Sequence, residues 1–387
     1  MRMTRTRATI AIGLVVGSLA LTACSSPAAE EEGTTEITIG AIDLAAAGCP
    51  ADITIQTDWN PQAEHGHLYN LLSDAYTIDS DAMTVTGPLF ASGEYTGVDL
   101  TIASGGPAIG FSQPNAQMYS DDSIFAAYVG ADEAIAHSGD LPTVGVFAPL
   151  EKDPQMIMWD PATYPDVTDI AGLGEAGATI RAFPGRTYID YFVGVGTLKA
   201  EQIDSTYDGT PAVFVNEGGK VAQQGFASAE PYIYEFEVEA WGKPVDYQLI
   251  NDAGYPTYAA VVSVKPETIT EYADCLTALV PVLQQATVDY YADPAMANEL
   301  ILTLVEEYDT GWVYSQGVAD FSVETQLNDG IASNGPDDTV GNFDSDRVQA
   351  LFDIVHPIYT AAERPVAEGV TATDIYTNEF VDPAIGF

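Results

Sequence analysis

Asp52-Ile53-Thr54-Ile55-Gln56-Thr57-Asp58-Trp59-Asn60-Pro61 is the stretch of this chain that decides its fold class. Its first six residues alternate in polarity, which predicts a strand with two differently solvated faces. Helical spacing follows the proline, at Ala63, His67, Leu68, Leu71 and Leu72, so a helix is expected to begin near Pro61. A strand, a polar turn and a helix in this order are typical of α/β proteins.

The rest of the chain continues this alternation of strands and helices. Further strands are expected at residues 98–103, 124–129, 143–150 and 155–159, with a helix after the second of them that ends near His137. A second set begins near residue 166, with elements at residues 179–183, 188–195, 212–215 and 245–250. A strand at 258–264 then returns to the first set. Helices follow at residues 266–308, broken near Asp293-Pro294, and at residues 344–362.

This order predicts two lobes, because a first unit is interrupted by a second one and then resumed. The chain is long enough for two domains of ordinary size. We expect one lobe at residues 37–151 and 253–387 and the other at residues 152–252, joined by two crossing strands as a hinge.

The first residues have the pattern of an export signal. Three arginines precede an apolar run at residues 8–21, which is too short to span a bilayer but suits a secretory signal. Leu21-Thr22-Ala23-Cys24 then resembles the lipobox of bacterial lipoproteins. The resemblance implies that residues 1–23 are removed and that lipid on Cys24 anchors the protein to the cell membrane, outside the cytoplasm. An ordinary signal peptide with a chance cysteine is the alternative. Residues 24–36 are expected to form a flexible stalk.

The charge balance restricts the partners. The chain has 57 Asp+Glu against 12 Lys+Arg, a formal net charge of −45. Such a surface repels nucleic acid, which is therefore not expected as a partner. A salt-adapted or acid-biased proteome explains this balance, and a cationic partner is the alternative. Because residues 25–151 contain no Lys or Arg, a site in that half must use hydroxyls, carboxylates, aromatic rings, His or backbone N–H groups. This weakens the case for nitrate or a sulfonate without excluding it, since helix N-termini also bind anions.

The cysteines favour one disulfide. With Cys24 assigned to the lipid, only Cys49 and Cys275 remain, in an oxidising compartment. Their pairing is the preferred interpretation, and two separate buried thiols are the alternative. They are too few and too scattered for a zinc site, and neither metal nor cofactor is expected.

Four turns at expected strand ends are rich in small and polar residues. In open α/β sheets, ligands bind at the carboxyl ends of strands and against helix N-termini. The turns are Asp58-Trp59-Asn60-Pro61, Ser104-Gly105-Gly106-Pro107, Gly130-Ala131-Asp132-Glu133 and Pro184-Gly185-Arg186-Thr187.

In this order the motifs resemble type II periplasmic binding proteins, the solute-binding proteins of ABC importers. Asp58-Trp59-Asn60-Pro61 followed by His65-Gly66-His67-Leu68-Tyr69 is similar to the thiamine-pyrimidine-precursor group of the nitrate, sulfonate and taurine binding superfamily. The segment 223–233, with Glu230-Pro231-Tyr232, is similar to the Gly-x-x-x-x-Glu-Pro-Tyr element of that superfamily. Residues 169–173 and 375–380 resemble two further blocks, so the resemblance covers nearly all of residues 50–385.

The resemblance implies an α/β, two-lobed fold whose cleft closes on one small molecule. Trp59 is expected either to stack on a flat ring or to pack at the strand end. Asp58 either accepts a hydrogen bond from an amino group or caps the following helix. His65 either bonds a ring nitrogen or hydroxymethyl group or is structural. A metal at His65 and His67 is disfavoured, because residues two apart on a helix do not face each other.

The second lobe is expected to contribute Glu230, which either binds ligand or braces the hinge. Arg186 either holds an anionic group or pairs with Glu217, and tyrosines supply ring contacts or packing. The full expected ligand set is Asp58, Trp59, His65, Ser104, Gly105, Asp132, Arg186, Tyr188, Glu230 and Tyr255.

The resemblance implies a monomeric binding protein, with no chemistry of its own, that delivers a small heteroaromatic solute to an ABC permease and its ATPase. A hydroxymethyl-aminopyrimidine, the thiamine precursor, is the leading ligand; a sulfonate, nitrate or riboflavin-like solute is the alternative. Two other classes stay open: an enzyme like the thiamine-pyrimidine synthases, whose cysteine-rich iron site has no counterpart in this sequence, and a ligand-sensing lipoprotein.

Overall fold

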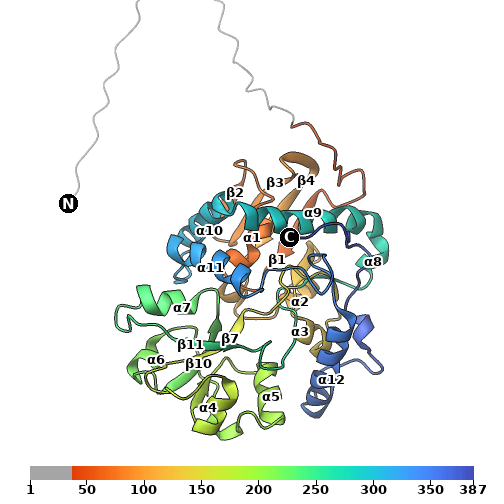
Figure 1. Ribbon diagram of the computed structural model, residues 1–387. Helices are drawn as coiled ribbons and strands as arrows, with labels where there is room; N and C mark the ends of the chain where they lie inside the picture. Colours follow the sequence, from red (N-terminus) through yellow and green to blue (C-terminus); the bar gives the residue numbers. More distant parts are fainter. Residues whose placement is uncertain (1–36) are drawn as a thin grey trace, which may run out of the picture. The chain divides into compact units, whose positions relative to one another are not determined.

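The computed structural model describes residues 37–387. The predicted signal peptide, the lipidation site at Cys24 and the stalk up to residue 36 lie outside the described residues. Within the described part, the strands form two separate sheets with helices around them (Figure 1). The alternation read from the sequence therefore does produce an α/β protein.

The first sheet has the strand that opened the sequence analysis at its centre. β1 (Asp52–Gln56) pairs in parallel with β4 (Glu94–Ala103) on one side and β5 (Ile124–Tyr128) on the other. Ile53 and Ile55 are buried, as the alternation predicts. Outside these strands lie β2 (Thr77–Asp79) and β3 (Thr84–Ala91) at one edge, and β12 (Val262–Val264) and β6 (Val144–Phe147) at the other.

The second sheet is built from the middle of the chain. Its strand order is β11 (Asp246–Leu249), β7 (Gln155–Trp159), β10 (Val221–Phe226), β8 (Thr179–Arg181) and β9 (Ile203–Asp204). The helices between these strands are α4 (Ile170–Ala176), α5 (Thr187–Gly194), α6 (Ala212–Asn216) and α7 (Glu230–Tyr232).

The chain passes between the two sheets at residues 148–154, after β6, and returns at residues 250–261, before β12. These two passages give the fold the two lobes and the two crossing segments expected from the sequence. The lobe boundaries at 151/152 and 252/253 fall inside the two passages and stay predictions.

Long helices close the first sheet and connect the lobes. α9 (Ala273–Ala292) and α10 (Ala295–Tyr308) are separated at Asp293-Pro294, where the sequence predicted a break, and both pack on the short α1 (Gly66–Tyr69). The segment after α10 forms α11 (Gln316–Asn328). α12 (Ser345–Ala361) packs against α3 (Ala131–Ala136) of the first lobe and α5 of the second.

Some elements were not predicted. β3 was missed because Gly87 and Pro88 stand inside its apolar alternation, and both residues ordinarily interrupt a strand. The structure accommodates them with a register shift between Pro88 and Phe90 in its pairing with β4. β2, β10 and α11 were also missed, as was α2 (Pro114–Ser120). Residues 212–215, read only as an element of the second set, belong to the helix α6.

Cys49 and Cys275 form a disulfide, the pairing preferred from the sequence, with Cα atoms 4.8 Å apart. It joins the segment before β1 to the first turns of α9. Within residues 37–387, no helix is both long and apolar enough to cross a membrane.

Candidate functional site

The carboxyl ends of parallel strands meet at one edge of the first sheet, and a cavity of about 330 Å³ lies there. The turns after β1 and β5 line it with Asp58, Trp59, Asp132 and Glu133, and the second lobe lines its other side. Its size falls in the range of roughly 300–1,000 Å³ that small-molecule sites occupy. Of the expected ligand set, the cavity is lined by Asp58, Trp59, Asp132, Arg186, Tyr188, Glu230 and Tyr255.

Aromatic rings form one wall of the cavity. The Trp59 ring lies 5.9 Å from Phe111, 6.3 Å from Phe183 and, edge-on, 6.1 Å from Trp312 (centroid distances). Gly106 faces this wall with φ +57°, and a Cβ there would lie 2.9 Å from the indole of Trp59. The turn after β4 therefore needs glycine at that position, because a side chain would displace the ring.

His65, expected either to bond the ligand or to be structural, does not line the cavity. Its side chain is fully buried, and its Nε2 lies 2.8 Å from Oδ1 of Asp58, which faces the cavity. The role of His65 is to position the Asp58 carboxylate. His67 bonds the hydroxyl of Tyr128 at 2.9 Å, and burial lowers its pKa to about 3, so it is neutral.

Ser104 and Gly105 do not line the cavity either. They follow β4, and the Gly105 N–H donates to the Trp59 carbonyl at 3.0 Å. A Cβ on Gly105 would lie 2.3 Å from the carbonyl oxygen of Thr57. Gly105 therefore supports the turn that carries Asp58 and Trp59.

Asp132 lines the cavity but is already bonded within the protein. Its carboxylate accepts hydrogen bonds from the hydroxyls of Thr187, Tyr255 at 2.9 Å and Thr257 at 3.3 Å. Thr187 begins α5 of the second lobe, and Tyr255 and Thr257 lie in the returning passage. Asp132 therefore links the first lobe to the second at the N-terminus of α5.

Arg186 lies at the start of α5 and pairs with Glu133 at 3.9 Å, instead of with Glu217 as one alternative had it. Its guanidinium also lies 5.6 Å from the centre of the Phe183 ring. Burial and the neighbouring Asp132 raise the pKa of Glu133 to about 7, although Arg186 opposes this shift.

Glu230 begins α7 and accepts a hydrogen bond from the Phe226 N–H at 2.7 Å. Burial raises the pKa of Glu230 to about 7. Tyr188 donates to Oε1 of Gln224 at 3.1 Å, and the same oxygen accepts the Phe183 N–H at 2.7 Å. The second lobe therefore presents a carboxylate, an amide and a phenol that its own hydrogen bonds hold in place.

Sequence reasoning missed several cavity residues. Phe183 is the last residue of the strand predicted at 179–183. The tendency of ligands to bind at the carboxyl ends of strands would have identified it. Asp153 lies in the first passage between the lobes, and Trp312 follows α10, far along the chain. No local pattern marks those two residues. Nowhere in residues 37–387 are three or more His, Cys, Asp or Glu side chains arranged to hold a metal ion.

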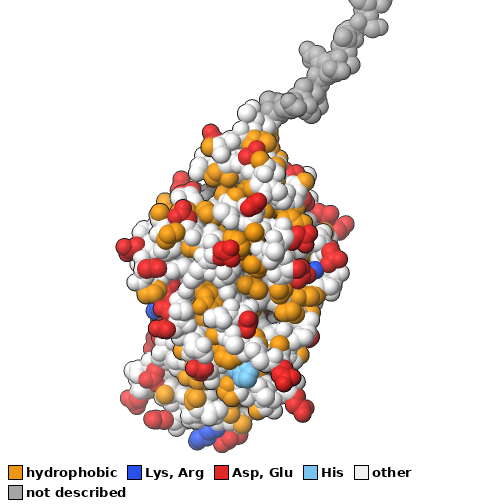
Figure 2. Space-filling view, turned by 90° about the vertical axis from the view of Figure 1, so that its right-hand side faces the viewer, with side chains coloured by type: hydrophobic (Ala, Val, Ile, Leu, Met, Phe, Trp, Pro, Cys, Tyr) orange, Lys and Arg blue, Asp and Glu red, His pale blue; other side chains and the backbone are white. Residues whose placement is uncertain are grey.

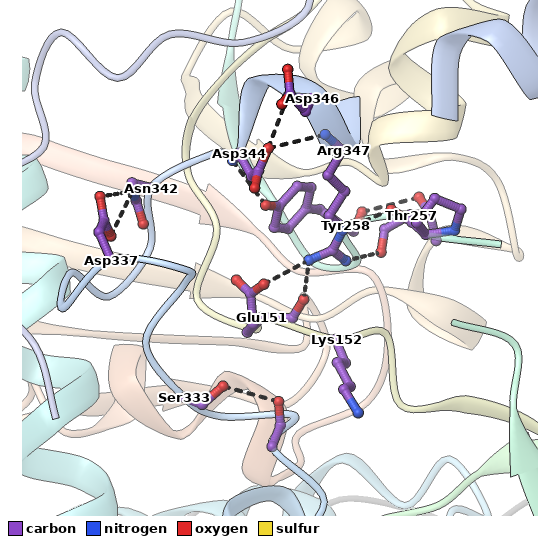
Figure 3. Close-up of polar contacts among 12 residues, drawn as sticks. Glu151, Lys152, Thr257, Tyr258, Ser333, Asp337, Asn342, Asp344, Asp346 and Arg347 are labelled. Atoms are coloured by element: carbon purple, nitrogen blue, oxygen red, sulfur yellow. Dashed lines mark hydrogen bonds and ion pairs between the residues drawn. The ribbon is translucent and has the colours of Figure 1, made fainter. Parts of the chain in front are cut away.

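One arginine joins the two passages beside the cavity. Arg347, in the first turn of α12, donates from Nη2 to the Thr257 carbonyl at 2.7 Å and from Nη1 to Oε1 of Glu151 at 3.0 Å. Its guanidinium lies 3.6 Å from the centre of the Tyr258 ring. Figure 3 shows this side chain lying against Tyr258 and reaching toward both Glu151 and Thr257.

No protein-family model matches the sequence, and no curated protein matches it. Solved structures do resemble this one. The ligand-binding component of an ABC-type import system from Staphylococcus aureus, solved with zinc bound, is 12% identical with a TM-score of 0.52, over 87% of this chain and 100% of that chain. The periplasmic aliphatic sulphonate binding protein SsuA from Escherichia coli is 12% identical with a TM-score of 0.53, over 82% and 89%. A protein from Bordetella bronchiseptica RB50 is 14% identical with a TM-score of 0.51, over 86% of this chain and 96% of that chain.

The fold is that of a periplasmic binding protein. At these identities the likeness extends to the path of the chain but not to the chemistry of the cavity, which depends on the residues that line it.

Proposed function

We propose that this protein is the extracytoplasmic solute-binding component of an ABC importer, and that it captures a small, flat, nitrogen-containing solute. The observation that carries this proposal is the position of the cavity. It lies between two lobes that two passages connect, where a hinge motion closes it over a ligand. The ring wall around Trp59 suits a flat solute, and the carboxyl groups opposite suit its amino groups.

A hydroxymethyl-aminopyrimidine stays the leading ligand. Asp58, held by His65, and Glu230, held by the Phe226 N–H, are acceptors for ring amino groups. A sulfonate or nitrate is the second possibility, because Arg186 and Arg364 also line the cavity. Riboflavin-like solutes share the need for a ring wall.

The proposal includes an anchor and a partner. Cys24 carries the lipid, the acidic surface is exposed outside the cytoplasm, and the monomer delivers its solute to a permease and ATPase without chemistry of its own. Metabolic labelling with palmitate tests the anchor: label should enter the wild type and be absent from Cys24→Ser. An enzyme and a ligand-sensing lipoprotein stay alternatives. Genomic adjacency to a permease and an ATPase would favour the importer component over the sensor.

A thermal-shift panel tests the binding function, because a ligand bound only by the native state raises apparent stability by RT ln(1 + [L]/Kd). Pyrimidine precursors, riboflavin, taurine and nitrate are tested in excess. A shift with a pyrimidine alone supports the leading ligand. A shift with an anion alone assigns the site to Arg186, and no shift with any solute contradicts the proposal.

A further inference from the structure

Carboxyl groups outnumber guanidinium groups in the cavity. Its lining contains Asp58, Asp132, Glu133, Asp153 and Glu230 against Arg186 and Arg364. Acidic side chains are also scattered over the face of the molecule in Figure 2. Those on the surface are solvated at little cost, whereas burying an ionised carboxylate is costly unless a partner compensates it. The acidic surface therefore does not explain the carboxylates inside the cavity.

Most of these carboxylates have partners within the protein. Asp132 accepts hydrogen bonds from three hydroxyl groups, Asp58 bonds His65, and Glu133 forms an ion pair with Arg186. Asp153 and Glu230 are bonded more sparsely, because each accepts one backbone N–H, Glu230 from Phe226 at 2.7 Å. The Gln155 N–H donates to Oδ1 of Asp153 at 2.8 Å, and no donor among residues 37–387 reaches the other oxygen of Asp153. Asp153 is only 8% exposed, and it lines the cavity.

Burial and several neighbouring charged groups act on the Asp153 carboxyl group. Burial raises the pKa of Asp153 to about 7, the Gln155 N–H opposes this shift, and Asp132 reinforces it. Asp58 also raises this pKa, and Arg186 lowers it. The lining thus has two guanidinium groups, of Arg186 and Arg364, against five carboxyl groups, which favours a cation over an anion.

The ring wall suits a cation as well as a flat ring. Cations are attracted to the faces of aromatic rings, most strongly to tryptophan. The Phe183 face is already approached by Arg186 at 5.6 Å, whereas no Lys or Arg of residues 37–387 lies over the Trp59 ring. A cationic ligand would therefore find, in one cavity, the Trp59 ring with no Lys or Arg over it and an Asp153 oxygen that no donor of residues 37–387 reaches.

We infer that the solute is a cation, with a protonated amine or an amidinium-like group on or beside a flat ring, held by Asp153 and the Trp59 wall. The inference rests on the proposed binding function and favours a positively charged relative of the aminopyrimidine over the neutral hydroxymethyl compound. It separates this cavity from one built for sulfonate or nitrate.

Calorimetric titration of the purified full chain tests this charge with two series of matched probes. One series is an aminopyrimidine bearing an aminomethyl, a hydroxymethyl or a carboxylate group. The other is the N-methylated nicotinamide cation, nicotinamide and nicotinate. Within a series the ring stays the same while the charge changes from positive to neutral to negative. We expect a cation to bind at least about tenfold more tightly than its neutral partner.

Asp153→Asn assigns the preference to one residue. The amide keeps an oxygen for the Gln155 N–H but loses the charge, so the loop is retained. This variant should lose most of the tenfold preference. Asp246→Asn is the matched control: it removes one charge from an exposed residue of β11 in the same lobe, and should leave the preference unchanged. An equal loss in both variants would mean a general effect of net charge and would overturn the role of Asp153.

The possible failures are distinguishable. If a neutral or anionic probe binds most tightly in either series, the inferred charge is wrong while the binding function stands. If no probe of either series binds, both the charge and the aromatic solute are contradicted.

Discussion

Arg347 donates hydrogen bonds from one nitrogen, Nη1, to both the backbone carbonyl and the carboxylate of Glu151. Its Nε and Nη2 reach the carbonyls of Pro256 and Thr257 at 2.9 and 2.7 Å. Glu151 lies in the outgoing passage between the lobes, and the other two acceptors lie in the returning one. One planar guanidinium thus joins the two segments that connect the lobes.

Arg347→Lys should loosen this junction. Lysine keeps the charge but has a single ammonium group, which cannot reproduce the fork of donors. We expect a loss of about 2–3 kcal/mol in the free energy of unfolding, because buried carbonyls are left without donors. Chemical denaturation measures this loss. Lys152→Ala, which removes the exposed pair with Asp252, should cost less than about 1 kcal/mol; equal losses in the two variants would contradict the role of Arg347.

The fold was largely predictable because its periodicities are local. The alternation in β1, the apolar run of β5, the break at Asp293-Pro294 and the spacing in α12 each depend on a few neighbouring residues. β3 escaped because its glycine and proline are tolerated only through a register shift against β4, which is a tertiary feature.

The site was predictable where it follows from strand ends and unpredictable where it depends on packing. Asp58 and Trp59 line the cavity as the position of their turn implied. His65, seven residues later, is buried and bonds the Asp58 carboxylate. No sequence pattern distinguishes a residue that lines a cavity from one that positions such a residue. Asp153 and Trp312 meet at the cavity only through the arrangement of the lobes.

Trp59→Ala should weaken ligand binding by about tenfold or more while the protein stays folded. The ring is only partly buried and forms the centre of the aromatic wall, and one aromatic contact contributes about 0.5–1.5 kcal/mol beyond its buried area. Calorimetric titration with the solute identified by thermal shift checks this, and Trp59→Phe should recover part of the affinity. Unchanged affinity in Trp59→Ala would exclude a role in stacking.

Asp153 should make the stability of the free protein depend on pH. Burial raises its pKa in the folded state from the usual value of 3.8 to about 7. The folded protein therefore binds this proton more tightly than the unfolded chain does, and the stabilising contribution is full below pH 3.8 and is lost as the pH rises through 7.

Asp153→Asn mimics the protonated form, so the variant should have the higher Tm at pH 8, and its advantage should shrink as the pH falls toward 5. Thermal unfolding across this range measures the difference between the two proteins, which cancels the effect of the many other carboxylates. A difference that does not change with pH would contradict the raised pKa.

Ser228→Ala should destabilise the contact between the lobes. Ser228 donates a hydrogen bond to Glu64, and both side chains are buried. Burial raises the pKa of Glu64, and the Ser228 hydroxyl opposes this shift. Removing the hydroxyl leaves a buried carboxyl group without that partner, at a cost of about 1–3 kcal/mol. Denaturant unfolding measures the cost, and Ser228→Thr, which keeps the hydroxyl, should recover more of the stability than Ser228→Ala.

Loss of the Cys49–Cys275 bridge should lower stability by about 2–5 kcal/mol, because it closes a long loop with a sequence separation of 226 residues and so restricts the unfolded chain. The double variant Cys49→Ser/Cys275→Ser should show this loss by chemical denaturation. Adding a reductant should destabilise the wild type and leave the double variant unchanged, which separates the bridge from other effects of the reductant. Thiol titration of denatured, unreduced protein supplies the independent check, since a bridged protein has neither of these two thiols free; finding both free would contradict the bridge.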